Sequence, residues 1–423
     1  MHKRFGYLPV VSQLHDANAL EPLVGPYLSW LDALGGERRS ADDLRQDAPL
    51  LFLVGTGGTE RQILQLWAER PVVGAGPVIL IAHPDHNSLA ASLEVLARLQ
   101  QEGAAGCVVF IDQPNDPSAD ARLLAAVHDL EVDRSLRVSR LGLVGTPSDW
   151  LVASSPDARA VRTMWGCVVH NIPTDVLRES LSVVDPASVG PEADAFVREA
   201  SRVAEPDPGQ IREAVRVYLA LRQIVEAEEL DALTVRCFDL VVKEQTTACY
   251  ALARLNDEGL IAGCEGDLVT AVGMLWVKLL LGQLPWMANV ARVDEANDTM
   301  WLAHCTVPRT LVREYAIRSH FESGLGVGIQ GTFATGPMTL VRIGGASMEK
   351  VWIAEGNLVQ TGDDEHLCRT QVQLKLDTGT VAELLRAPLG NHLVVVPGHH
   401  ADRLRAWWKL VIQPRATNGK GNP

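Results

Sequence analysis

Two carboxylates flank a glycine in the segment Cys264-Glu265-Gly266-Asp267, and this is the first place along the chain where the residue types suggest chemistry. The apolar run just before it, Ile261 to Cys264, predicts a short strand, and the apolar stretch from Leu268 to Leu281 predicts a helix. Ligand sites of α/β proteins gather at the carboxyl ends of strands. Acidic groups also suit the positive end of a helix, and on this pattern alone a simple helix cap is the favoured interpretation.

Two histidines follow downstream in segments that read as strands, and two asparagines lie near them in the sequence. His304 lies in the run Trp301 to Pro308, His392 follows Asn391, and Asn289 closes the segment Met287-Ala288-Asn289. A lone histidine in an apolar strand is usually a hydrogen-bonded core residue. The Glu-x-x-His and His-Glu-x-x-His spacings of helical metal sites are absent, so spacing alone is weak support for a metal.

The glycine-rich segment Gly55-Thr56-Gly57-Gly58-Thr59 follows the apolar run Leu50 to Val54 and invites comparison with a phosphate-binding loop. The match fails, because no Gly-Lys-Ser/Thr follows and position 60 is Glu where the G-x-G-x-x-G pattern needs glycine. A tight turn that also lines a ligand cleft is the better interpretation.

The elements that must position these residues fall into three predicted domains and a tail. Residues 1–148 and 149–282 alternate apolar strand-like and helix-like segments, which predicts two parallel-sheet α/β domains. Residues 283–415 read mainly as strands separated by glycine-containing turns, with a closing helix near 401–412, which predicts a β-barrel-like or sandwich domain. Residues 416–423 are polar and read as a mobile tail.

Bulk properties narrow the class of protein. The 423 residues carry a formal net charge of −14 with no long basic run, which argues against a nucleic-acid partner. The seven cysteines are scattered without a C-x-x-C pair, which fits a reducing compartment. The N-terminal residues lack the apolar region of a signal peptide, and no run of 18 apolar residues occurs, so we expect a soluble cytoplasmic protein without a membrane partner.

The ordered motifs resemble the L-fucose/L-arabinose isomerase-like family, in particular its shorter L-fucose isomerase-related members. The resemblance rests on the segments around Glu265, Asn289, His304 and His392, and on further segments spread over most of the chain. These further segments are Gly57 to Glu60, Asn87 to Ala91, Pro147 to Ser154 and Ser319 to Gly324.

The resemblance implies three domains, a homo-oligomer (a trimer or hexamer), a divalent metal, typically Mn2+, and interconversion of an aldose and a ketose in carbohydrate metabolism. Such a reaction removes a proton beside a carbonyl and passes through an enediolate, which a divalent ion can stabilise while acidic groups move protons. Oxygen ligands with imidazole suit manganese.

Carried over residue by residue, the resemblance assigns metal ligands. Glu265 matches the family's first metal-binding carboxylate, which is also a proposed base. Asn289 lies 289 − 265 = 24 positions later, where the fucose isomerases place their second carboxylate ligand. His392 matches the C-terminal histidine ligand, and His304 resembles the extra histidine of the arabinose isomerase branch. Asp267 is assigned to catalysis beside Glu265.

Four residues are assigned to substrate binding. Glu60, Asn87 and Asn391 belong to family-like segments with polar side chains. Trp286 is assigned because aromatic rings stack on sugar faces, although core packing would explain it, Trp150 and Trp301 equally well.

The sequence departs from the family pattern at Asn289, because a neutral amide can coordinate a metal but cannot take up a proton near pH 7. Either another acid replaces the missing carboxylate, with Asp267, Asp294 and Glu322 as candidates, or the reaction differs from isomerisation. The alternatives are another enediolate reaction on a sugar, such as epimerisation or retro-aldol cleavage, and a sugar-binding relative without catalysis.

Overall fold

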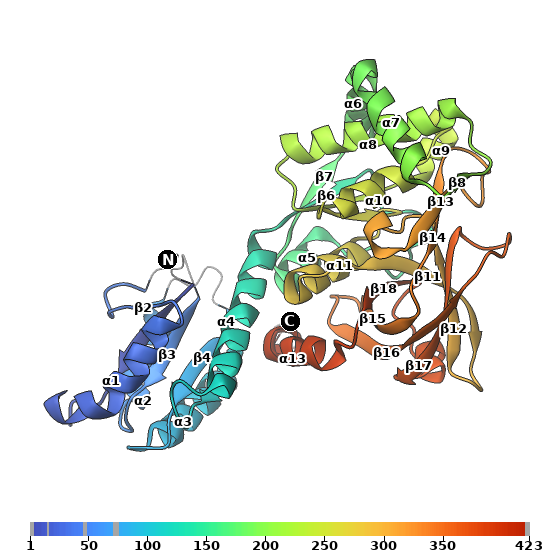
Figure 1. The fold of residues 1–423 in the computed structure, drawn as a ribbon. Coiled ribbons are helices and arrows are strands. Elements are labelled where there is room, and N and C mark those ends of the chain that lie inside the picture. The colour runs from blue at the N-terminus through green and yellow to red at the C-terminus, as the bar shows by residue number, and fades with distance from the viewer. Residues whose placement is uncertain (1–3, 15–16, 45–48, 71–75, 419–423) are drawn as a thin grey trace. The chain divides into compact units, whose positions relative to one another are not determined.

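The computed structural model describes residues 4–14, 17–44, 49–70 and 76–418, and its ribbon is drawn in Figure 1. The chain divides into two compact units. The first comprises residues 1–135 together with 406–423, and the second comprises residues 136–405. The candidate site lies in the second unit.

The first unit is a parallel sheet covered on both faces. The strand order is β2-β1-β3-β4-β5, and every pair is parallel. The strands are β1 (Phe5–Val10), β2 (Gly36–Arg38), β3 (Leu50–Val54), β4 (Val78–Ala82) and β5 (Gly106–Phe110). The helices are α1 (Ala17–Ala33), α2 (Glu60–Glu69), α3 (Ser88–Gln101), α4 (Pro117–Val138, to residue 135 in this unit) and α13 (Ala401–Asn418, from residue 406).

Two hydrophobic clusters occupy opposite faces of this sheet. One joins α1 and α4 to the side chains of Leu51 and Leu53, and the other joins α2 and α3 to Phe52 and Val54. Successive side chains of a strand point to opposite faces, so an uninterrupted apolar strand feeds both clusters. The sequence had not predicted α1, a helix with Pro22 and Pro26 inside it.

The second unit begins with a parallel sheet of strand order β10-β9-β6-β7. Its strands are β6 (Arg140–Val144), β7 (Val168–Ile172), β9 (Ala232–Val235) and β10 (Ile261–Cys264). Its helices are α5 (Ala158–Trp165), α6 (Thr174–Val183), α7 (Pro186–Glu199), α8 (Pro208–Ala227), α9 (Phe238–Glu244), α10 (Cys249–Asp257) and α11 (Leu268–Leu281). The sequence analysis placed the β6 segment in the N-terminal domain, whereas its pairing partners here are β7 and β9. The four domain bounds stay a prediction.

The C-terminal part of this unit is a closed antiparallel barrel of strand order β11-β12-β17-β16-β15-β18. The strands are β11 (Trp286–Asp294), β12 (Thr299–His304), β15 (Gly336–Gly344), β16 (Lys350–Thr361), β17 (Thr370–Thr378) and β18 (His392–Pro397), and the short helix α12 spans Val381–Arg386. The predicted fold class is therefore confirmed: parallel-sheet α/β domains, then a β-barrel and a closing helix.

Some expected barrel residues belong elsewhere. Residues 327–333 lie in the region predicted to form the barrel, but their strand β14 (Gly328–Thr332) pairs with β13 (Glu314–Arg318) and, through it, with β8 (Arg202–Val203) in a separate small sheet. The 3-10 turn η1 (Arg309–Leu311) precedes β13. Strand β11, which the sequence analysis did not predict, closes the barrel instead.

Helix α11 joins the parallel sheet to the barrel. It contacts β9 and β10 on one side and β15 and β18 on the other, and nearly all its side chains are buried. A Cβ on Gly273 would lie 3.2 Å from Val394 Cγ2 and 3.4 Å from Ile343 Cδ1, so glycine permits close packing there. Because α11 is covered by the sheet on one side and by the barrel on the other, its residues are apolar all round.

No helix in the described residues combines the length and the apolar character that crossing a membrane requires.

We predict that Gly273→Val lowers the free energy of unfolding of the second unit by about 1–3 kcal/mol, because the added methyl groups overfill the contact between α11 and the barrel. The midpoint of urea unfolding measures this. Ala187→Val, at an exposed position of α7, is the control for the helix penalty of a β-branched residue. Equal shifts in the two variants would contradict close packing at Gly273.

Candidate active site

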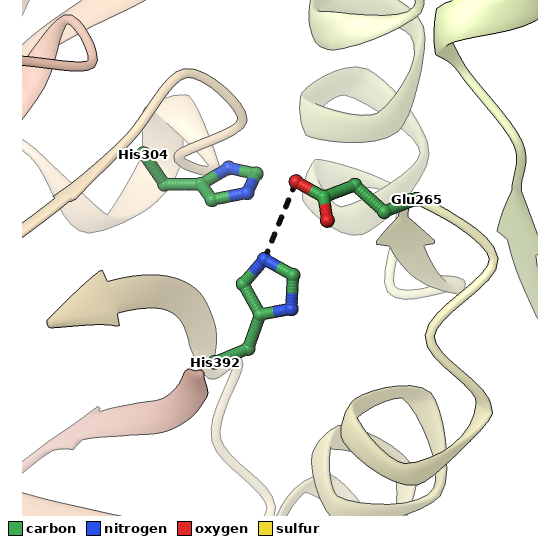
Figure 2. A group of neighbouring side chains, drawn as sticks. All are labelled: Glu265, His304 and His392. Atoms are coloured by element: carbon green, nitrogen blue, oxygen red, sulfur yellow. Dashed lines mark ion pairs between the residues drawn. The ribbon is translucent and has the colours of Figure 1, made fainter. Parts of the chain in front are cut away.

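Glu265, His304 and His392 come together in the second unit. One ligand atom from each lies within 4.8 Å of the others, and all three side chains are buried; among the described residues this is the group suited to hold a metal ion. Figure 2 shows Glu265 facing His392 across an ion pair, with His304 beside both. The three residues follow β10, end β12 and begin β18, respectively.

Strand register brings the two histidines to one rim of the barrel. Asn289 of β11 is the Cα partner of His392 on one side and of Ala303 on the other. His304, the last residue of β12, therefore lies next to this row. The rings of His304 and His392 meet edge to face, with centroids 5.4 Å apart.

The backbone at Glu265 takes an uncommon conformation that turns the chain sharply after β10. Glu265 has φ = 63° and Gly266 has φ = 72°. A Cβ on Gly266 would lie 2.7 Å from the carbonyl oxygen of Thr146, so glycine is required there. A non-glycine residue at positive φ costs roughly 1–3 kcal/mol and persists only where surrounding contacts enforce it. Ser148 N donates a hydrogen bond to Glu265 O at 2.9 Å and helps to hold the turn.

The ring of His392 is oriented by a carboxylate. Its Nδ1 lies 2.9 Å from Asp267 Oδ2, and its Nε2 lies 3.5 Å from Glu265 Oε1. A charged carboxylate accepts a hydrogen bond, so Nδ1 carries a proton and donates a hydrogen bond to Asp267. Nε2 then faces Glu265 and His304, and it offers a lone pair to an ion once its own proton is lost, an arrangement typical of metal-ligating histidines.

Asp267 is fully engaged by neighbouring donors. Its Oδ1 accepts a hydrogen bond from Thr270 N at 2.8 Å, its Oδ2 accepts one from Thr270 Oγ1 at 2.7 Å, and Arg342 NH1 lies 3.6 Å from Oδ2. Burial opposes the charged form, but the hydrogen bond from His392 and the charge of Arg342 outweigh it and lower the pKa of Asp267 to about 2. Asp267 therefore stays ionised inside the protein.

Arg342, from barrel strand β15, ties these groups together. Its NH1 donates to Thr270 Oγ1 at 2.7 Å and to the carbonyl oxygen of His392 at 3.0 Å. Its NH2 donates to Ser154 Oγ, which lies on the loop after β6. Burial lowers the pKa of Arg342, and the charge of Asp267 opposes that shift.

The electrostatics of the two histidines differ. Burial, followed by the nearby His392, lowers the pKa of His304 to about 4, so its ring is neutral; Thr306 Oγ1 lies 2.9 Å from its Nδ1. Burial would also lower the pKa of His392, but Asp267 and Glu265 raise it to about 9. Burial raises the pKa of Glu265, yet contacts with His392 and Trp150 leave it below its ordinary value.

A cavity of about 330 Å³ opens onto this group. Trp150, 49 % exposed, donates a hydrogen bond from Nε1 to Glu265 Oε2 at 2.5 Å, and its ring meets Phe238 edge to face at 4.8 Å. The lining residues are Trp150, Cys237, Phe238, Cys249, Cys264, Glu265, Asn289, His304, Cys305, His320, Glu322, Cys368 and Asn391. His392 and Asp267 are buried and are not among the described residues that line the cavity.

The two predicted amides are neighbours at the cavity wall. Asn391 Nδ2 donates to Asn289 Oδ1 at 3.2 Å, and both residues line the cavity. Trp286 is buried against Phe333, with ring centroids 5.3 Å apart, and is not among the described residues that line the cavity. The binding roles predicted for Trp286, Asn289 and Asn391 stay predictions.

Glu60 and Asn87 belong to the first unit, where they meet at its glycine-rich turn. Glu60 begins α2 and its Oε1 accepts a hydrogen bond from Gly58 N at 3.3 Å. Asn87 precedes α3 at φ = 59°, and a Cβ on Gly57 would lie 2.9 Å from the Asn87 Cβ. The turn lies at the carboxyl end of β3, next to β1, where the strand order reverses, which is a usual place for ligands. Whether Glu60 and Asn87 bind substrate stays a prediction.

The sequence analysis did not identify Arg342 or Thr270. Both act through contacts between elements far apart in the chain, and an arginine in a barrel strand gives no local signal of its partner. Trp150 was considered only for stacking, whereas its hydrogen bond to Glu265 gives it a place in the site.

A divalent cation fits the donor set. His392 Nε2 is a buried nitrogen without a hydrogen-bond partner among the described residues. Two ligands about 2.1 Å from one ion at a tetrahedral angle lie roughly 3.4 Å apart. The 3.5 Å between His392 Nε2 and Glu265 Oε1 matches that spacing better than it matches a hydrogen bond. One carboxylate with two imidazoles suits manganese, zinc or iron, and the geometry does not select among them.

Comparisons with known proteins place the chain near sugar isomerases, although no family model matches it. It is 26% identical over 363 residues to a sulfoquinovose isomerase of Clostridium sp. (strain MSTE9), covering 83% of this chain and 70% of that protein. It is 19% identical over 302 residues to the sulfoquinovose isomerase of Priestia aryabhattai, covering 69% and 67%. For that of Alkalicoccus urumqiensis the identity is 22% over 238 residues, covering 55% and 53%. These distant relatives support a sugar isomerase family, and the L-fucose isomerase-like assignment stays a prediction.

We predict that Asp267→Asn weakens the binding of a divalent cation, with Mn2+ as the probe, by about 10–100-fold, because the amide no longer fixes the His392 ring through a charged hydrogen bond. Titration calorimetry with Mn2+ measures the change, and circular dichroism checks that the variant is folded. Asp294→Asn, the same substitution at an exposed position of β11, is the control. Wild-type affinity in folded Asp267→Asn would exclude this orienting role.

Proposed function

We propose that the protein is a metal-dependent isomerase that interconverts an aldose and a ketose through an enediolate. The observation that carries the proposal is the buried group of Glu265, His304 and His392 facing a cavity large enough for a sugar. The names of the distant relatives support the same reaction class.

The reaction moves a proton between two neighbouring carbons and shifts the carbonyl with it. Glu265, His304 and His392 would hold a divalent ion, proposed to be Mn2+, which when bound would supply positive charge that stabilises an enediolate. The chain must also bind the sugar and hold it beside these three residues. It must provide a side chain that takes and returns the proton.

Contacts divide the roles of the carboxylates. Glu265 Oε2 is held by Trp150, and Glu265 Oε1 faces His392, so this side chain is fixed as a ligand. Asp267 is buried behind the cavity lining, where four donors surround it. We therefore propose that Asp267 positions His392. Its predicted role as a proton carrier is disfavoured, because these four donors already engage its carboxylate.

Glu322 is the candidate for the second acid/base group, in place of the carboxylate that Asn289 replaces. Of the three substitutes that the sequence offered, Glu322 is the one that lines the cavity, and its side chain is exposed. Asp294 lies at the exposed end of β11, outside the lining. An exposed carboxylate can exchange its proton with solvent between turnovers, which a saturated buried one cannot.

The rest of the lining suits a polyhydroxy substrate. The Asn289–Asn391 pair offers both amide donors and an acceptor to sugar hydroxyls, and the exposed ring of Trp150 offers a face for the apolar side of a sugar. The lining includes two carboxylates, Glu265 and Glu322, and neither lysine nor arginine. A sulfonated or phosphorylated sugar would need its positive partner from residues beyond this lining.

Asn289 favours one alternative, another reaction through the same enediolate, such as epimerisation. Loss of a charged ligand changes which proton transfers the site can complete, while the first step, proton removal beside the carbonyl, is common to both reactions. The position of the carbonyl in the product distinguishes them. The predicted homo-oligomer and the predicted cytoplasmic location stay predictions alongside either reaction.

We predict Mn2+-dependent exchange of solvent deuterium into the carbon beside the carbonyl of one sugar. The protein is incubated in heavy water, with and without Mn2+, with neutral, sulfonated and phosphorylated aldoses and ketoses, and NMR follows exchange and product. A C1–C2 isomer as the product supports the isomerase, and an epimer supports the alternative. Absence of exchange on all these sugars would overturn both.

We further predict that two substitutions separate ligand from proton carrier. Glu265→Gln should abolish exchange and weaken Mn2+ binding, because it removes a charged ligand. Glu322→Gln should slow exchange by about 100–10,000-fold with Mn2+ affinity unchanged, because an amide cannot carry the proton. Glu295→Gln, on the exposed β11–β12 turn, is the control. Wild-type exchange in Glu322→Gln would assign the second proton transfer to another group.

A further inference from the structure

The cavity is unusually rich in sulfur. Five of the seven cysteines line it, although they come from different parts of the chain. The five are Cys237, Cys249, Cys264, Cys305 and Cys368. The three-residue group suited to a metal contains none of them, so the proposed reaction leaves all five thiols without a function.

Two of these thiols are in direct contact. Cys237 Sγ and Cys264 Sγ lie 3.0 Å apart, and both side chains are buried. The backbone holds them there, because Cys237 N and Gly266 N both donate hydrogen bonds to the carbonyl oxygen of Val235, at 2.8 and 2.9 Å. Strands β9 and β10 pair in parallel, with Val235 opposite Cys264. The two cysteines therefore lie at the carboxyl ends of neighbouring strands.

We propose that Cys237 and Cys264 form a site of reversible oxidation, where a two-electron oxidant small enough to enter the cavity converts the thiol pair into an intrachain disulfide. With hydrogen peroxide, one thiol sulfur attacks a peroxide oxygen, breaking the O–O bond and giving a sulfenic acid and water. The second thiol sulfur then displaces the hydroxyl as a second water and forms the S–S bond. Two thiols are oxidised by two electrons in total, and one peroxide is reduced to two waters.

The disulfide would act on the metal group through the adjacent residue. A disulfide sulfur pair is about 2.05 Å apart, so the two sulfurs must approach by about 1 Å. Cys264 is bonded directly to Glu265, whose backbone already sits at φ = 63°. A shift of Cys264 is therefore passed to the Glu265 carboxylate, which must stay within reach of His304 and His392. This consequence rests on the proposed function, whereas the cross-link itself does not.

The neighbouring thiols define the competing outcome. Cys305 interacts with Cys249 and with Cys368, so oxidation could also join Cys305 to one of them. The contact between Cys237 and Cys264 differs because both of its backbone segments are anchored to one carbonyl oxygen, which limits how far the sulfurs can separate.

Tryptic peptides distinguish these cross-links, because each of the five thiols falls on its own peptide. The peptides span residues 237–243, 244–254, 255–278, 293–309 and 351–369. The folded protein is treated with hydrogen peroxide, its remaining thiols are alkylated at acid pH, and the non-reducing digest is analysed by mass spectrometry. We expect 237–243 joined to 255–278, with the loss of two hydrogen atoms, and its disappearance after dithiothreitol.

Two variants complete the test. Cys237→Ser should leave no such cross-link, while Cys107→Ser, altered in β5 of the first unit, should form it as the wild type does. Oxidised wild-type protein should bind Mn2+ at least about 10-fold more weakly, with recovery on reduction. Persistence of free Cys237 and Cys264 after peroxide treatment, or a cross-link confined to Cys305, would overturn the proposal. A cross-link with unchanged Mn2+ binding would overturn only its link to the metal group.

Discussion

The site depends on one buried contact, the hydrogen bond between His392 Nδ1 and Asp267 Oδ2 at 2.9 Å. It fixes which ring nitrogen carries the proton and turns the other toward Glu265 and His304. The same aspartate caps α11 through Thr270 N, and α11 packs on both the parallel sheet and the barrel. The helix cap and the orientation of the His392 ring thus depend on the same side chain. The cap interpretation is confirmed for Asp267, and the ligand role of Glu265 stays a proposal.

That contact requires buried charge, and the fold compensates for it from three directions. Removing one partner of a buried ionic pair typically costs about 3–5 kcal/mol, because the remaining charge is left unpaired. Asp267 accepts hydrogen bonds from the first turn of α11 and from the barrel histidine His392. It also forms an ion pair with Arg342. Arg342 in turn donates to the carbonyl oxygen of His392. The charges that orient the His392 ring therefore also hold the sheet, α11 and the barrel together. The same contacts help to stabilise the strained turn at Glu265.

Much of the fold was predictable because its signals are local. Apolar runs predicted the strand Ile261–Cys264 and the helix Leu268–Leu281 with the observed bounds. Helix α1 was missed because its two internal prolines argue against a helix, and β11 because its outer half is polar and exposed. Within the site, Glu265, His304 and His392 are separated by 304 − 265 = 39 and 392 − 304 = 88 positions. No periodicity connects such residues; the order of family-like motifs predicted them, and barrel register brings the two histidines together. Arg342 and the hydrogen bond of Trp150 depend on packing alone and left no pattern to read.

The chemistry of the cavity sets oxygen and nitrogen ligands beside sulfur. Thiolates favour soft ions, whereas carboxylate and imidazole together accept manganese as well as zinc and iron. A cavity with five thiols would therefore be expected to draw softer ions away from the Glu265 group. The contacts oppose this, because Cys237 is paired with Cys264, and Cys305 interacts with Cys249 and Cys368. Sulfur atoms held against one another are less available to an ion than the lone pair of His392 Nε2, which has no hydrogen-bond partner in the described part of the chain. The pairing of the thiols and the orientation of His392 thus both favour binding of a cation at the group of Glu265, His304 and His392.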